Sequence, residues 1–209
     1  MAKRQKATAT LQLKIVLEHT DPSILRQVTI PNNFTLHELH LVIQSAYNWK
    51  NCHLHMFYKG KRRDTIAADI NSDGWGGEAD EGSQDTKKTF VTDFLGNDKE
   101  IYYEYDLGDS WSHSIKLEKT LPEPTTKPKL LNAENYAPVE DCGGDWGWYE
   151  KLEFLANYPK KPTEDDKDLL NWLAELIPEL DKKNPRTFNP TEINKSEIAA
   201  RIEKYTKMN

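Results

Sequence analysis

The sequence predicts an α+β fold built on a mixed, mainly antiparallel β-sheet, and three patterns support that prediction. Apolar and polar residues alternate over 11–17, as in a half-buried strand, and a turn at 21–23 leads to a partner strand around 28–30. A capped helix start follows at 35–38, and a further strand-like run follows at 53–58. We therefore expect one helix packed on the sheet, with more helices near the C-terminus.

Thr35 begins the clearest helix of the sequence. It is a suitable N-cap, Glu38 stands three residues later to complete a capping box, and Phe34 can form a hydrophobic staple with Leu39. The helix should run to about Tyr47. A hairpin, a helix and a strand in this order are also how a β-grasp fold starts.

Later segments supply the rest of the sheet. In the strand predicted at 53–58, alternation places His53 and His55 on one face. A short helix at about 90–95 precedes two strands, 101–106 and 111–117, which form a hairpin.

We expect a single domain over residues 1–209. The basic N-terminal arm, 1–10, is predicted to be disordered. Surface loops are expected at 69–88, which is rich in Gly and Asp, and at 120–138, which shows no periodicity. Residues 163–209 are expected to form a helical C-terminal part.

Two helices are predicted in that C-terminal part. Thr163 can cap the first, which Pro178 stops. The second should begin near Asn189-Pro190, where Glu192 follows three residues after the cap.

The cysteine count and the hydropathy pattern bear on location. Cys52 and Cys142 are too few for a disulfide scaffold. The start of the chain lacks an apolar run of signal-peptide length, and no later segment approaches a membrane span. We therefore expect a cytoplasmic protein with no membrane partner.

Charge is distributed unevenly along the chain. The formal net charge is −6, which argues against a protein that coats nucleic acid indiscriminately. Residues 1–63 hold 10 Lys and Arg against 3 Asp and Glu, or +7, which leaves 18 against 31, or −13, for the remainder. The basic part could contact nucleic acid, or it could be a solvated arm and hairpin. The candidate contacts are Lys3, Arg4, Lys6, Lys59, Lys61, Arg62 and Arg63.

One acidic segment is similar to the opening of an EF-hand calcium loop. Its candidate oxygen ligands are Asp69, Asn71, Asp73 and Asp80, with a glycine at the sixth position. However, the twelfth position holds Asp80 in place of the preferred Glu, and neither flank has a helical pattern. An irregular turn is the alternative interpretation.

A second candidate segment runs from Tyr105 to His113. It places Asp106 and Asp109 at the turn of the predicted hairpin and His113 on the return strand. A carboxylate could orient this imidazole as a base or a metal ligand. A hydrogen-bonded core histidine is the alternative interpretation.

The third candidate segment is Glu140-Asp141-Cys142-Gly143-Gly144. Its paired glycines permit tight turns and close backbone approach, so the three preceding polar side chains can line a pocket. Neighbouring acids should raise the pKa of the Cys142 thiol, which disfavours a thiolate nucleophile unless a cation or metal intervenes. A buried structural cysteine is the alternative.

Taken together, these segments resemble the plasmid ORF-three-like proteins, a family first named from a root-inducing plasmid and also carried as passengers of insertion elements. Members usually read Trp where this chain has Leu25, Phe for Leu107, Glu for Ser112 and Pro for Val139. The resemblance implies an association with mobile elements and does not by itself imply an activity. The matching residues are Leu25-Arg26, 35–40, Trp49, 53–57, 105–113, 140–144, Phe188 and Asn194.

Three functional hypotheses follow. In the first, the chain is a non-enzymatic binding module for a protein or nucleic-acid partner. In the second, it is a metal-dependent hydrolase in which His53, His113 and Cys142 help to hold a divalent ion. In the third, it binds nucleic acid through its basic N-terminal part. The first two share one set of candidate pocket residues: His53, His55, Asp106, Asp109, His113, Glu140, Asp141 and Cys142.

Overall fold

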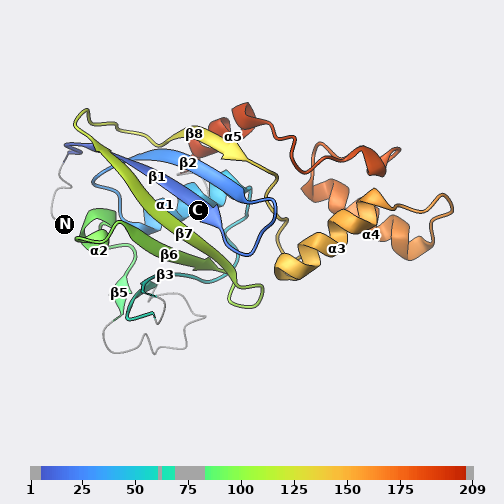
Figure 1. Ribbon diagram of the computed structural model, residues 1–209, viewed down its shortest axis with the longest axis horizontal. Coiled ribbons are helices and arrows are strands. Elements are labelled where there is room, and N and C mark those ends of the chain that lie inside the picture. Colours follow the sequence, from blue (N-terminus) through green and yellow to red (C-terminus); the bar gives the residue numbers. More distant parts are fainter. Residues whose placement is uncertain (1–5, 61–62, 69–82, 206–209) are drawn as a thin grey trace.

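The computed structural model describes residues 6–60, 63–68 and 83–205, and these form a β-sheet with one face covered by a helix (Figure 1). The sheet has eight strands in the order β5-β4-β3-β6-β7-β1-β2-β8. Its pairs are antiparallel except the short parallel pair of β4 with β5, which confirms the predicted fold class. The strands are β1 (Thr10–Leu17), β2 (Ile24–Pro31), β3 (His55–Lys59), β4 (Thr65–Ala68), β5 (Gln84–Asp85), β6 (Glu100–Tyr105), β7 (Trp111–Leu121) and β8 (Lys129–Glu134).

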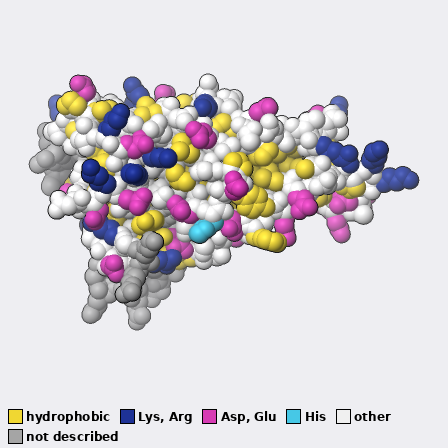
Figure 2. All heavy atoms as spheres, viewed as in Figure 1, with side chains coloured by type: hydrophobic (Ala, Val, Ile, Leu, Met, Phe, Trp, Pro, Cys, Tyr) yellow, Lys and Arg dark blue, Asp and Glu magenta, His cyan; other side chains and the backbone are white. Residues whose placement is uncertain are grey.

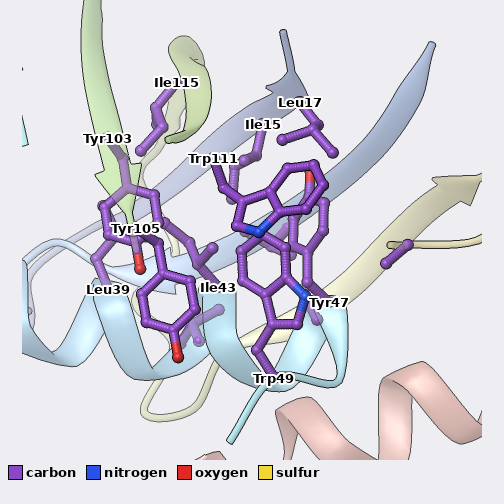
Figure 3. Packing of buried hydrophobic residues seen from close by; sticks show 14 of the residues in the cluster. Ile15, Leu17, Leu39, Ile43, Tyr47, Trp49, Tyr103, Tyr105, Trp111 and Ile115 are labelled. Atoms are coloured by element: carbon purple, nitrogen blue, oxygen red, sulfur yellow. The ribbon is translucent and has the colours of Figure 1, made fainter. Parts of the chain in front are cut away.

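Helix α1 (Leu36–Tyr47) is the main cover of the sheet. Both halves of the predicted capping box are present, between Thr35 and Glu38. Figure 3 shows Leu39 and Ile43 of α1 below the aromatic and aliphatic side chains that the strands direct toward the helix. The predicted start and end of this helix are therefore confirmed.

The inner face of the sheet follows strand periodicity, since alternate residues of each strand are buried. In β2 this places Arg26 in the same inward row as Val28 and Ile30, and Arg26 is only 2% exposed. His113 of β7 takes an equivalent core position. The core is thus apolar with a few fully enclosed polar side chains.

Helices α3 (Gly144–Ala156) and α4 (Glu164–Leu176) extend away from the sheet in Figure 1. A short 3₁₀ turn, η2 (Pro185–Thr187), follows, and α5 (Lys195–Ile202) returns to pack on α1 and β8. The capping of α4 by Thr163 and the short helix α2 (Val91–Leu95), ended by Gly96, are confirmed. Within the described ranges, no helix combines the length and apolar character needed to cross a bilayer.

Three predictions about elements were wrong. The predicted loop at 120–138 contains the edge strand β8, which pairs with β2. The last helix is capped by Asn194, because Asn189 instead accepts the backbone N–H of Thr191 in a local turn. Strand β3 starts at His55, so His53 lies in the preceding loop, outside the inward alternation of that strand.

Candidate functional site

Three loops that are distant in sequence meet beside the start of α3, and we call this place the three-loop site. It comprises residues 49–54, the β6–β7 turn with its flanking Tyr105 (105–110), and the glycine segment 140–144. Asp109 Oδ2 accepts the backbone N–H of Gly143 at 3.1 Å, which joins the second loop to the third. In Figure 1 the β6–β7 turn accordingly lies next to the first turn of α3.

The β6–β7 turn is held by Asp106. Its backbone has φ 55°, its N–H donates to Leu54 O at 2.9 Å, and its Oδ1 accepts the N–H of Gly108 at 3.0 Å. This is the Asx geometry that Asp tolerates well in the left-handed region. One carboxylate oxygen is thus used by the turn, and Oδ2 faces His53.

The glycine segment can approach this turn because it lacks side chains at the contact. Gly144 has φ +71°, and a Cβ placed on it would lie 3.0 Å from Asp109 O. At Gly147, in the first turn of α3, a Cβ would lie 1.9 Å from Cys142 O. Both positions therefore require glycine, on steric grounds at Gly147 and on conformational grounds as well at Gly144.

His53 is the centre of the three-loop site. Its Nε2 lies 3.1 Å from Asp141 Oδ1 and 3.6 Å from Asp106 Oδ2. The side chains are 29% exposed for His53, 13% for Asp106 and 66% for Asp141. Nε2 is itself shielded from solvent and makes no hydrogen bond within the described residues, although the two carboxylate oxygens lie near it.

Glu140 lies on the inner side of the same site and is 7% exposed. Its Oε1 accepts the hydroxyl of Tyr105 at 2.5 Å, and its Oε2 accepts the backbone N–H of Lys50 at 2.8 Å. Cys52 Sγ donates to the same Oε1 at 3.6 Å. Burial, followed by the charge of Glu140, raises the pKa of the Cys52 thiol.

Two groups of metal-ligating atoms meet here, and His53 belongs to both. One atom from each of Cys52, His53 and Glu140 lies within 4.8 Å of the others, and the same holds for His53, Asp106 and Asp141. Imidazole, carboxylate and thiolate are the ligands of zinc and similar ions. Sequence reasoning did not include Cys52 or Tyr105, although Cys52 directly precedes His53 and Tyr105 opens the Tyr105–His113 segment.

The structure does not bring His55 or His113 to this site. His55 stacks on His40 with ring centroids 3.6 Å apart, and His113 lies edge-on to Tyr47 and Trp49. Burial lowers the pKa of both His55 and His113 to about 3. They are neutral core histidines, the alternative that the sequence analysis left open for His113.

Cys142 is also turned away from His53. It is buried, and its Sγ lies 3.8 Å from Gly144 O, to which it donates. Burial, with a contribution from Asp109, raises the pKa of its thiol to about 12. The predicted metal set of His53, His113 and Cys142 is therefore not assembled, because two of its members face the interior.

The basic residues near β3 are engaged in local contacts. Lys59 Nζ lies 3.0 Å from Asp98 Oδ2 and donates to Leu95 O, and Arg63 pairs with Glu104. Figure 2 shows acidic and basic side chains interspersed over the part of this face that the sheet forms. Lys3, Arg4, Lys61, Arg62 and the calcium-loop candidates Asp69, Asn71, Asp73 and Asp80 lie outside the described residues.

A hollow of about 210 Å³ adjoins the other side of the β6–β7 turn. Asp109 and Ser110 of the turn line it together with Glu18, His19 and Asp145. The three-loop site thus has space for a small polar group beside it.

Comparison of sequence and structure relates this chain to known proteins. A model of the family described as plasmid pRiA4b ORF-3-like protein matches residues 9–197. The uncharacterised protein y4hQ of Sinorhizobium fredii is 36% identical over 152 residues, which cover 71% of this chain and 74% of that protein. The crystal structure of MM3350 from Methanosarcina mazei, a protein of unknown function, has a TM-score of 0.70 and 28% identity, covering 93% of this chain and 98% of that one.

Proposed function

Because this chain belongs to the plasmid pRiA4b ORF-3-like family, whose matched relatives carry no named activity, we propose its function from the three-loop site: a binding module that takes a divalent metal ion at His53, Asp106 and Asp141. The ion would join the three loops and present its remaining coordination positions to a partner. Both cysteines are free thiols, which supports a reducing location such as the cytoplasm.

The observation that carries the proposal is the position of His53 Nε2, shielded from solvent and facing two carboxylate oxygens from two other loops. An ion pair of this kind at a partly exposed place contributes little stability, about 0–1 kcal/mol. A divalent ion among the same atoms would bind far more strongly. The fixed Asx turn at Asp106 supports such a site, since it orients Oδ2 before any ligand arrives.

Titration of chelator-treated full-length protein with Zn²⁺ and Mn²⁺ in a calorimeter tests the proposal. We expect one ion per chain, and a loss of affinity of at least about tenfold in His53→Ala and Asp141→Asn. Asp145→Asn is the matched control, since Asp145 is an exposed acid of the same region that accepts Trp146 N–H and lies outside both ligand groups. Wild-type protein that takes up no ion, or equal affinity in all variants, would reject the proposal.

A metal-dependent hydrolase is the second candidate, and the 66% exposure of Asp141 favours it. An ion held there would keep a coordination position for water, whose proton it would make easier to remove. The test is metal-dependent hydrolysis of chromogenic phosphate and carboxylate esters. Activity that persists in His53→Ala would exclude this site as its origin.

A further inference from the structure

We infer that Cys52 and Glu140, together with His53, are ligands of the metal site, so that the ion it takes is a thiophilic transition metal of the zinc class and not Mg²⁺ or Ca²⁺. This inference rests on the proposed function and adds the chemical identity of the ligand. It starts from the second ligand group, Cys52, His53 and Glu140, whose donor atoms lie within 4.8 Å of one another.

Glu140 is positioned as a ligand by neighbours that are already in place. Tyr105 donates its hydroxyl to Oε1, and the backbone N–H of Cys52 donates to the Tyr105 hydroxyl oxygen at 3.1 Å. The backbone N–H of Lys50 donates to Oε2 of Glu140. These contacts orient the carboxylate in the way that outer-shell partners orient metal ligands. Tyr105 belongs to the end of β6, and the N–H groups of Lys50 and Cys52 come from the loop that carries Cys52.

Cys52 can be reached by an incoming ion. It is an exposed free cysteine, whereas Cys142 is buried and donates to Gly144 O. On coordination the Cys52 thiol would lose its proton to solvent and form a sulfur–metal bond. Hard cations such as Mg²⁺ and Ca²⁺ prefer an all-oxygen set, so a thiolate and an imidazole together select against them.

The test is a Co²⁺ titration of the full-length, chelator-treated protein followed by absorption spectroscopy. We expect visible d–d bands together with a near-ultraviolet thiolate-to-cobalt charge-transfer band. Cys52→Ser should abolish the charge-transfer band and weaken Zn²⁺ binding at least about tenfold, since even outer-shell partners are worth about 10- to 100-fold. Cys142→Ser is the matched control and should retain the band.

A second measurement reports the same ligand without spectroscopy. Iodoacetamide should alkylate Cys52 in the metal-free wild type, and Zn²⁺ should protect it while Mg²⁺ does not. Cobalt binding without a charge-transfer band, a band that survives Cys52→Ser, or equal protection by both ions overturns this inference and leaves the proposed function standing. Absence of any Co²⁺ or Zn²⁺ binding by the wild type would overturn the proposed function itself.

Discussion

His53 and His113 show how two regions of one molecule use the same side chain differently. His113 is 0% exposed and lies edge-on to Tyr47 and Trp49, so burial favours its neutral form. His53, before the first residue of β3, is 29% exposed and faces two carboxylates. Enclosure by aromatic rings gives a packing residue, whereas a loop position beside acids gives a partly exposed imidazole that contacts two carboxylates.

The largest effect is expected at Trp49, the buried first residue of the three-loop site. Trp49 is 2% exposed and donates Nε1–H to Pro138 O at 2.9 Å. Trp49→Ala should lower the free energy of unfolding by about 3–5 kcal/mol. Trp146, which is 75% exposed, is the matched control. Trp146→Ala should change the free energy of unfolding by less than about 0.5 kcal/mol. Urea unfolding measures both, and equal losses would contradict the assignment of Trp49 to the core.

The next largest effect is expected at Arg26, the cation of the core. Its guanidinium donates to the carbonyls of Ala46, Glu134 and Asn135, and burial lowers its pKa. Arg26→Met would leave those acceptors unsatisfied, and we expect a loss of about 2–3 kcal/mol in unfolding free energy.

The matched control for Arg26 is Arg186, which donates to the exposed carbonyl of Tyr158. Arg186→Met should lower the free energy of unfolding by less than about 1 kcal/mol. A stability of Arg26→Met equal to that of the control would show that water replaces the guanidinium without cost.

A smaller effect concerns pH. His55 and His113 have their pKa lowered from 6.5 to about 3 in the folded protein, so the unfolded chain takes up protons first as pH falls. The stability that these two imidazoles contribute is therefore complete above about pH 6.5 and is lost as pH falls from 6.5 toward 3, with a slope of about one proton for each histidine.

Urea unfolding between about pH 5 and 6.5 isolates this histidine effect, because most carboxylates remain ionised there. Either substitution, His55→Gln or His113→Gln, should reduce the slope of unfolding free energy against pH by the amount that corresponds to one bound proton. An unchanged slope in both variants would mean that these imidazoles titrate normally in the folded state.

The smallest expected effect on stability is at His53. His53→Gln should change the unfolding free energy in metal-free buffer by less than about 1 kcal/mol, because its ion pairs are partly exposed. With Zn²⁺ at about 100 times its Kd, the wild type should gain about 2.7 kcal/mol and His53→Gln should gain almost nothing. Thermal unfolding with and without Zn²⁺ measures the difference, and an equal gain in both proteins would locate the ion elsewhere.

Local chemistry made much of the fold predictable. The capping box at Thr35, the N-cap at Thr163 and the alternation of β1 depend on residues a few positions apart, and the structure contains all three. The boundaries of helices and strands were harder to predict from the sequence. Strand β8 carries no clear alternation and exists because β2 offers it an edge to pair with, which is a long-range effect.

Most residues of the candidate site could be selected from the sequence, but their arrangement in space could not be predicted from it. Asp106, Glu140 and Asp141 were selected from the sequence because they stand in polar segments with turn residues. His53 was selected because it was predicted to share a strand face with His55. Their contact depends on the approach of a glycine segment to a hairpin turn across about thirty intervening residues, which no local pattern encodes. His113 was grouped with them because alternation says which residues share a face, not which face the core encloses.

The anchoring of Trp49 has a consequence for how a ligand could enter and leave. Its indole is fixed between aromatic rings of the core, and the very next residue, Lys50, donates its N–H to Glu140. The loop that carries Cys52 and His53 is thus anchored at its first residues. The proposed ion would then exchange past the exposed side chains of Asp141 and Cys52, without displacement of Trp49.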